Sequence, residues 1–429
     1  MKTTERMRMC KMIRPNDLIL AENHYYSMDC YETQLNNNVL VVGTSGSGKT
    51  RSIVSPNILQ ASGSYIISDP KGNLYQKYRH YLEEQGYTVK KLDFIRPNHS
   101  AHYNFFKYIH SEKDILKIAH MLVYSSTEPG AKVDPIWDQT SELLLTALIG
   151  YLHYHARVED RNLEGLLKLV VACQINENDS GQTNALDRIM EEVGRRDKSD
   201  FSYRQYQMFR LAAGRTLKSI LITVTGKLGK YNYSELNQML AKDDIDIASI
   251  GKKKTALFVV VSDTDRSLDE LVNVFYTQAM NELCMYADTR CKDSRLPIDV
   301  RFILDDFATN CMIDDFPKMI ASIRSRGIST MLMIQAESQL KSAYGEDGKT
   351  IIGNCDTYIY LGGNDVETAE QVAKRCNLPL QKILEMPVGT NWIFRRGQKA
   401  TSATNFKLEP FAKEKLGQIM HEPELKRVS

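Results

Sequence analysis

The hydrophobic pattern of this 429-residue chain divides it into stretches of two kinds. In the first kind, short runs of branched and aromatic residues alternate with segments of helical spacing. Such runs are typical of strands that are buried on both faces of a parallel sheet and joined by helices. The expected strands are 39–42, 65–68, 88–92, 255–261, 301–304, 329–334, 358–361 and 391–394. The pattern therefore predicts an α/β fold with a mostly parallel twisted sheet.

Helical spacing defines the second kind of stretch, which runs from about residue 111 to residue 250 and contains few strand candidates. Elsewhere, the expected helices are 51–60, 74–85, 268–287 and 314–326, followed by 367–375. The predicted organisation is a lead-in of 1–37, an α/β domain of 38–110 and 251–410, an inserted all-α domain of 111–250, and a polar, mobile tail of 411–429.

Composition narrows the class of protein. The chain is 42% hydrophobic, and its 55 Lys and Arg residues nearly balance its 53 Asp and Glu residues. Net charge therefore argues neither for nor against a nucleic-acid partner. Eight scattered cysteines without a C-x-x-C pair indicate neither a zinc site nor a disulfide framework. No signal peptide or transmembrane segment is visible, so we expect a cytoplasmic protein that reaches a membrane only through partners.

Residues 39–50, VLVVGTSGSGKT, match the phosphate-loop pattern G-x-x-x-x-G-K-[ST] at each fixed position. Glycines allow backbone N–H groups to turn inward around a polyphosphate. Lys49 would reach the β- and γ-phosphates, and the Thr50 hydroxyl would ligate Mg²⁺. The residues expected to bind nucleotide are Gly43, Thr44, Ser45, Gly46, Ser47, Gly48, Lys49 and Thr50.

Two carboxylates, Asp305 and Asp306, end the strand expected at 301–304. Asp305 would hold Mg²⁺ through water, and Asp306 would orient or deprotonate the attacking water. Taken alone, an acidic turn after a strand is the more common explanation, but beside a phosphate loop we favour the catalytic one. The long separation of Asp305 from Lys49 also requires an insertion in the α/β domain.

Other candidate site residues have structural alternatives. Lys71 follows the second expected strand, where α/β sheets bind ligands, although Asp69 in the same turn could simply cap a helix. Arg324 could complete a neighbouring subunit's site or cap the helix 314–326. Gln335, at the tip of strand 329–334, could sense the γ-phosphate. Basic and aromatic residues alternate in 203–231, which suits nucleic-acid binding, but we favour a solvated helix face with buried aromatics.

Several segments together resemble the type IV secretion coupling proteins, the VirD4/TraG group of conjugative DNA-transfer ATPases. The similar stretches are GTSGSGKT (43–50), SDPKGNLY (68–75), IWDQTSELLLTAL (136–148), ILDDFA (303–308), IASIRSRGISTMLMIQAESQLKSAYG (320–345) and LGGNDVETAEQVAK (361–374). They cover roughly residues 38–400 in the family's order, so the probability of chance agreement is very small.

The resemblance implies a RecA-like domain with an inserted all-α domain, in a hexameric ring that binds ATP and Mg²⁺ between subunits. It implies Thr50 and Asp305 on Mg²⁺, Asp306 as the catalytic carboxylate, Arg324 as an arginine finger on the adjacent subunit and Gln335 as a sensor, with a softer role for Lys71. The family's usual Asp-Glu is Asp-Asp here, Asn73 replaces an acid, and the usual N-terminal transmembrane helices are absent.

We therefore expect an ATP-dependent coupling protein that recruits relaxase-bound single-stranded DNA, or a protein substrate, and delivers it to a type IV secretion channel at the inner membrane. ATP is favoured over GTP because the chain has no N-K-x-D motif. We expect a homo-hexamer when active and a monomer in isolation. The alternatives are a double-stranded DNA translocase of the FtsK/HerA type and a substrate-receptor scaffold that does not hydrolyse ATP.

Overall fold

The computed structural model describes residues 12–124, 135–173, 184–213, 217–309 and 311–417. The chain divides into two compact units. The first unit comprises Met1–Lys90, Ile247–Val259 and Leu283–Ser429, and the second comprises Lys91–Asp246 and Val260–Glu282. The chain therefore leaves the first unit and returns to it, as an insertion requires.

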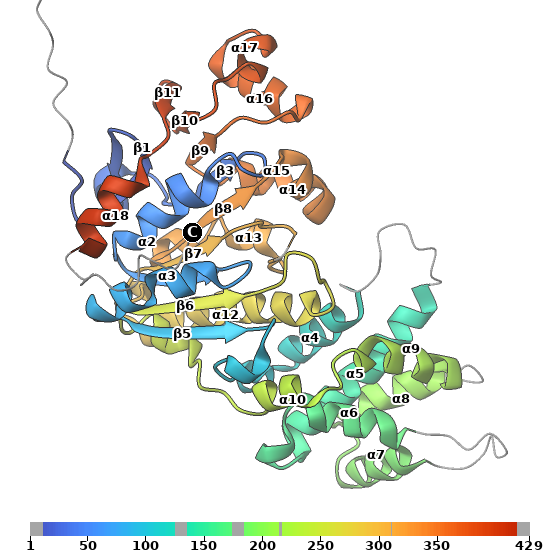
Figure 1. Cartoon of the computed structure of the whole chain (residues 1–429). Helices are drawn as coiled ribbons and strands as arrows, with labels where there is room; N and C mark the ends of the chain where they lie inside the picture. The colour runs from blue at the N-terminus through green and yellow to red at the C-terminus, as the bar shows by residue number, and fades with distance from the viewer. Residues whose placement is uncertain (1–11, 125–134, 174–183, 214–216, 310, 418–429) are drawn as a thin grey trace, which may run out of the picture. The chain divides into compact units, whose positions relative to one another are not determined.

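A central sheet organises the first unit (Figure 1). Among the described residues it has nine strands in the order β11-β10-β9-β3-β8-β7-β4-β6-β5. Their bounds are β3 (Val39–Val42), β4 (Ser64–Ser68), β5 (Thr88–Asp93), β6 (Thr255–Val260), β7 (Val300–Leu304), β8 (Ile328–Ile334), β9 (Thr357–Tyr360), β10 (Thr390–Arg395) and β11 (Thr401–Thr404). The run from β9 to β6 is parallel, whereas β10 pairs antiparallel with β9 and β11. The predicted mostly parallel α/β sheet is confirmed.

Apolar side chains explain why the central strands form. Every residue of β3, β4, β6 and β7 is buried, as continuous apolar runs predict for strands covered on both faces. One face of the sheet packs against residues of a π-helical turn η1 (Thr50–Val54), α2 (Ser55–Leu59), α3 (Asn73–Glu84) and α18 (Leu408–Gly417). The hairpin of β1 (Asp17–Ala21) and β2 (His24–Ser27) joins this core.

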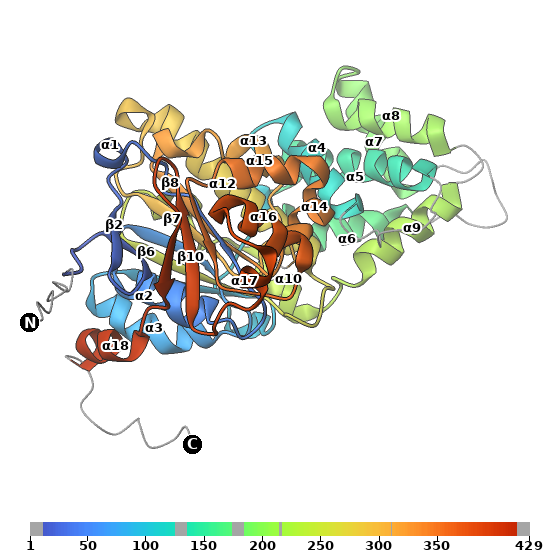
Figure 2. The ribbon, with the colours of Figure 1, turned by 90° about the horizontal axis from the view of Figure 1, so that it is seen from above.

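Other helices of this unit are short. Figure 2 shows α13 (Phe316–Met319) and α15 (Gly348–Gly353) on the face opposite α2 and α3. The remaining elements are α1 (Cys30–Thr33), α11 (Ile247–Ile250), η6 (Lys292–Ser294), η7 (Ile323–Arg326), α14 (Glu337–Tyr344), η8 (Gly345–Asp347), α16 (Val366–Cys376) and α17 (Leu380–Leu384). α12 (Asp269–Arg290) includes residues of both units.

The second unit is built around α5 (Pro135–His155), which packs against four neighbouring helices. Its other elements are η2 (Pro97–His99), η3 (Phe105–Tyr108), α4 (Glu112–Tyr124), η4 (Val158–Asp160), α6 (Leu163–Ala172), α7 (Ala185–Arg196), α8 (Phe201–Ala213), α9 (Leu217–Gly229) and α10 (Ser234–Ala241). Among the described residues between 112 and 246, no strand occurs. The helical texture predicted for this part of the chain is therefore present, and its domain bounds stay a prediction.

Three local predictions were wrong. The helix expected at 314–326 begins only at Phe316, because Asp315 adopts φ +57° and Pro317 suits the first turn of a helix, and it is divided into α13 and η7. Strand 391–394 is not the last one, because β11 follows it. The tail expected from residue 411 is helical as far as Gly417, since Leu408 and Phe411 are buried in the core of the first unit.

The described residues include no helix that is both long and apolar enough to cross a lipid bilayer.

Candidate nucleotide-binding site

The loop between β3 and η1 closes on itself at the carboxyl edge of the sheet. The N–H of Gly43 donates to the carbonyl of Ile334 at 3.1 Å. A Cβ at Gly43 would lie 2.6 Å from Ser47 Oγ and 3.0 Å from Leu361 Cβ, so a side chain there would force its neighbours to shift. Gly46 and Gly48 have φ of +78° and +93°, which favour glycine. The glycines of the motif are therefore needed for the loop itself, before any ligand is considered.

The two motifs that are far apart in sequence meet at this loop. The Thr50 hydroxyl donates to Asp305 Oδ2 at 2.9 Å. Lys49 is 8% exposed, and its Nζ donates to the carbonyls of Gly43 at 2.5 Å and Thr44 at 3.2 Å. The ammonium group is thus held over the loop, one residue before the hydroxyl that contacts the carboxylate.

Burial controls the electrostatics of this cluster. Burial raises the pKa of Asp305, and the hydrogen bond from Thr50 opposes that shift. Burial lowers the pKa of Lys49, against the attraction of the Asp305 and Asp306 charges. The cluster therefore concentrates ionisable groups in a place that disfavours charge, as is common where a charged ligand binds.

Asp306 lies in a turn with a left-handed backbone. Its φ is +52°, which is uncommon for a residue with a side chain and indicates a local constraint. Its N–H donates to Asp305 Oδ1 at 3.2 Å, and the next residue, Phe307, donates its N–H to the carbonyl of Met333 in β8. The turn is therefore anchored to the sheet on the side of the phosphate loop.

Lys71 and Gln335 also follow strands at the carboxyl edge. Gln335 comes directly after β8, the neighbour of β3, and its side chain is exposed. Lys71 is exposed in the turn after β4 and has φ +114°. In that turn Asp69 accepts hydrogen bonds from the N–H groups of Leu74 and Tyr75, at 3.0 and 2.8 Å. The alternative in which Asp69 caps the next helix is therefore the one observed.

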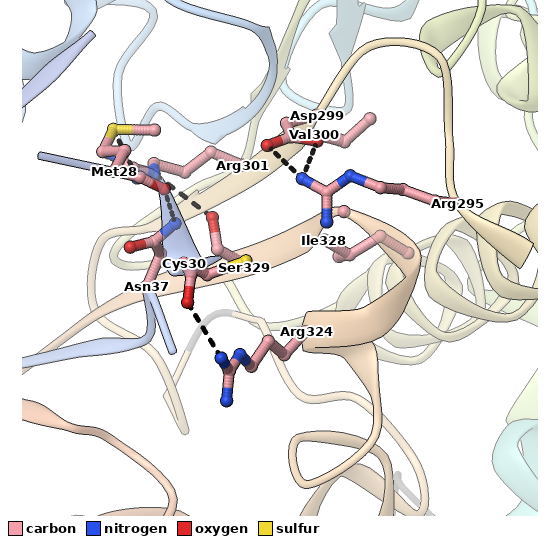
Figure 3. A pocket seen from close by; sticks show the side chains of 11 residues that line it. Met28, Cys30, Asn37, Arg295, Asp299, Val300, Arg301, Arg324, Ile328 and Ser329 are labelled. Atoms are coloured by element: carbon pink, nitrogen blue, oxygen red, sulfur yellow. Dashed lines mark hydrogen bonds and ion pairs between the residues drawn. The ribbon is translucent and has the colours of Figure 1, made fainter. Parts of the chain in front are cut away.

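Arg324 lies at the opposite edge of the sheet. It precedes β8, whose seven residues, at about 3.3 Å each, place it roughly 20 Å from the phosphate loop of the same chain. Its Nη2 donates to the carbonyl of Cys30 at 2.9 Å (Figure 3). The sequence-predicted site is thus split, with the phosphate loop, Lys71, Asp305, Asp306 and Gln335 at one edge and this arginine at the other.

In the described part of the basic and aromatic segment 203–231, the buried aromatic rings agree with the helix-face alternative, although Lys227 and Lys230 are largely covered. Tyr206 and Phe209 are almost fully buried, and the Tyr206 hydroxyl donates to Asp187. Lys227 and Lys230 form ion pairs with carboxylates of the same unit. These two aromatic rings are therefore part of the core and do not present a stacking surface for bases.

Sequence reasoning missed a contact between the carboxyl-terminal strands and the phosphate loop. Asn405 Nδ2 donates to the carbonyl of Ser47 at 3.4 Å, and Asn391 Nδ2 donates to Asn405 Oδ1 at 2.9 Å. Arg51, just after the loop, forms an ion pair with Glu409. No local pattern marks these residues, because the contact arises only when β10 joins the sheet beside β9.

Comparison with known proteins identifies the relatives of this chain. A family model described as type IV secretory system conjugative DNA transfer matches residues 2–377. The chain is similar to the conjugal transfer protein TraG of Escherichia coli, with 23% identity over 360 residues, covering 79% of this chain and 54% of TraG. It is also similar to protein VirD4 of Rhizobium rhizogenes, with 21% identity over 346 residues, covering 78% and 48%. The chain thus spans about half the length of these relatives.

Solved structures share the fold. The bacterial conjugative coupling protein TrwBdeltaN70, in complex with sulphate, matches with a TM-score of 0.67 and 16% identity, covering 94% of this chain and 91% of that chain. Plasmid coupling protein TrwB in complex with the ATP analogue ADPNP matches with a TM-score of 0.65 and 16% identity, covering 93% and 90%. The predicted RecA-like P-loop fold with an inserted all-α domain is confirmed.

Proposed function

The chain belongs to the type IV secretory system conjugative DNA transfer family, and we propose that it is an ATP-driven coupling protein. It hydrolyses ATP to deliver relaxase-bound single-stranded DNA, or a protein substrate, to a type IV secretion channel at the inner membrane. The observation that carries this proposal is the hydrogen bond from Thr50 to Asp305, which joins a phosphate loop to an acidic strand end. TrwB structures with ADPNP, and with ADP and Mg²⁺, support the choice of nucleotide.

The residues present fit a magnesium nucleotide. A hydroxyl and a carboxylate are hard oxygen donors of the kind that Mg²⁺ prefers. The Thr50 hydroxyl oxygen and Asp305 Oδ2 already lie 2.9 Å from each other. These two residues would hold the ion, which neutralises charge on the β- and γ-phosphates when bound. Lys49 would then exchange the carbonyls of its own loop for phosphate oxygens, while the loop's N–H groups surround the polyphosphate.

Asp306 is proposed to orient the attacking water. Its carboxylate is one methylene shorter than the Glu usual at this position in the family, so its reach is shorter. We expect this difference to slow hydrolysis and to leave nucleotide affinity unchanged, because Asp306 is assigned no contact with the phosphates. Gln335, at the same sheet edge, is proposed to sense the γ-phosphate, with Lys71 as a further neighbour of the nucleotide.

Arg324 is proposed to act on the nucleotide of an adjacent subunit. At roughly 20 Å from its own phosphate loop, with the length of β8 between them, it is too far to reach its own nucleotide. Its position at the other end of the sheet suits a head-to-tail ring, in which opposite edges of neighbouring chains face each other. The proposed active assembly is therefore a homo-hexamer with ATP between subunits.

ATPase activity measured with single-stranded DNA, with duplex DNA and without DNA tests the proposal. Stimulation by single strands supports it, stimulation by duplex alone supports a double-stranded DNA translocase, and no activity under any condition supports the scaffold. The Lys49→Ala variant should lose activity, whereas the matched Lys77→Ala variant, altered at an exposed position of α3, should keep it. Full activity of Lys49→Ala would contradict the site assignment.

A further inference from the structure

A small cavity lies at the amino edge of the sheet, at the end of β7 and β8 opposite the phosphate loop (Figure 3). Its volume is about 20 Å³, which is room for one water-sized group. Among the described residues that line it, the charged ones are Arg295, Arg301, Arg324 and Asp299. Three guanidinium groups therefore share the cavity with a single carboxylate.

Arg301 is the most deeply buried of these cations. It is the second residue of β7 and is 3% exposed. Its Nε donates to Ser329 Oγ at 3.3 Å, and its Nη2 contacts Met28 Sδ at 2.9 Å. Within the described part of the chain, no carboxylate lies at ion-pair distance from it. A buried charge with only a hydroxyl and a thioether as partners is costly unless a counter-ion accompanies it.

The other two arginines leave this charge uncompensated. Arg295 Nη2 donates to both carboxylate oxygens of Asp299, at 2.7 and 2.8 Å, so that ion pair is already complete. Arg295 Nη1 is buried and has no hydrogen-bond partner among the described residues. Arg324 donates to a neutral carbonyl, that of Cys30. The charges that line the cavity sum to an excess of about two positive charges.

We propose that this cavity binds one small inorganic anion close to a water molecule in size, a halide, between Arg301 and Arg295, with Arg324 at its border. The anion supplies the missing counter-charge of Arg301 and an acceptor for the unpaired Nη1 of Arg295. Guanidinium groups suit this task because their planar N–H groups match small anions and oxyanions. The site is separate from the phosphate loop, since the length of β8 lies between them.

Burial of Arg301 provides independent support. Burial lowers the pKa of Arg301, and nearby Tyr65 and Asp299 oppose the shift. A bound anion would act in the same direction as those two groups and would keep the guanidinium charged.

Thermal unfolding at constant ionic strength tests the proposal. Chloride is compared with phosphate and with gluconate, which are both too large for the cavity. The measurement uses the Lys49→Ala background, so that phosphate binding at the other loop does not contribute. We expect chloride to raise the midpoint by about 2 °C at ten times its Kd. A rise in phosphate or gluconate but not in chloride would contradict the size of the site.

Two variants locate the effect. Arg301→Met should abolish the anion-dependent rise, since it removes the buried charge while keeping an apolar side chain of similar length. Arg326→Met is the matched control, because Arg326 pairs with Asp288 outside the cavity, and it should keep the rise. Equal midpoints in all three salts, or a rise that survives Arg301→Met, would overturn the proposal.

Crystals of the unmodified chain soaked in bromide give a second measurement that does not depend on how a variant folds. An anomalous peak between Arg295 and Arg301 supports the site, and an empty cavity at high bromide refutes it. Neither result bears on ATP hydrolysis, so failure of this inference can be told apart from failure of the proposed function.

Discussion

A mixed-subunit experiment tests most directly the separation of Arg324 from the phosphate loop. Each chain carries a loop at one edge of its sheet and Arg324 at the other, roughly 20 Å away along β8. The Arg324→Ala variant should therefore bind nucleotide with unchanged affinity as a single chain. Its ATPase rate should nevertheless fall by about 10³-fold or more, the usual contribution of an arginine finger.

The same geometry predicts rescue between two inactive variants. Chains with Arg324→Ala keep an intact loop, and chains with Lys49→Ala keep an intact finger. In rings formed from a one-to-one mixture, an active interface needs an Arg324→Ala chain, which supplies the intact loop, next to a Lys49→Ala chain, which supplies Arg324. Random assembly makes this arrangement at about one interface in four, so the mixture should recover about a quarter of the unmodified rate, if interfaces act independently.

The assay is steady-state ATP hydrolysis under the conditions that activate the unmodified chain, with each variant also measured alone. Nucleotide affinity is measured separately by fluorescence titration of the dilute protein. A mixture that shows only the sum of the two separate rates would refute the action of Arg324 between subunits. Weaker nucleotide binding by the dilute Arg324→Ala chain would refute the assignment of the residue to the far edge.

Three further changes have defined outcomes. Asp306→Glu should raise the single-turnover rate of hydrolysis several-fold while nucleotide Kd stays constant; an unchanged rate would remove Asp306 from the catalytic position. Asn405→Ala should raise the ATP concentration needed for half-maximal rate by about three- to tenfold, because the loop loses the hydrogen bond to Ser47; an unchanged value would make that contact incidental. Tyr81→Phe should lower the free energy of unfolding at pH 7 by about 1 kcal/mol, since the carbonyl of Leu59 loses a donor 2.7 Å away. Burial raises the pKa of Tyr81 to about 12, so its contribution is complete below pH 10 and is lost as the pH rises toward 12; chemical denaturation of both proteins across that range should show a smaller alkaline loss in the variant.

The sequence alone was sufficient to predict an element where its local hydrophobic pattern and its chemistry point to the same structure. Continuous apolar runs identified β3, β4, β6 and β7, because a strand buried on both faces carries mainly apolar side chains, with Arg301 in β7 as the charged exception. The same holds for the phosphate loop, where Gly43 has a close approach to Ser47 and Gly46 and Gly48 have positive φ. In both cases the information needed to recognise the element lies within a few neighbouring residues.

Long-range packing explains what the sequence did not reveal. α18 is polar in composition, and only burial of Leu408 and Phe411 against the sheet shows that it is folded. The helix expected at 314–326 had the right periodicity, but it starts only after a left-handed Asp315 and is divided into α13 and η7. The partners of Arg301 are Met28, which follows β2, and Ser329 in β8. Because both are far from Arg301 in sequence, its lack of a counter-ion could not be predicted from neighbouring residues.

Strand β8 has a mechanical consequence for any ring that this chain forms. It is seven residues long and pairs with β7 over Ile328–Leu332 and with β3 over Met331–Ile334, so it resists both stretching and compression. Gln335 follows one of its ends and Arg324 precedes the other. In the proposed ring, those two ends would belong to consecutive nucleotide sites, and β8 would connect them as a stiff element. A displacement of one end when phosphate leaves would then move the other end. This coupling favours ATP hydrolysis at successive subunits around the ring over hydrolysis in random order.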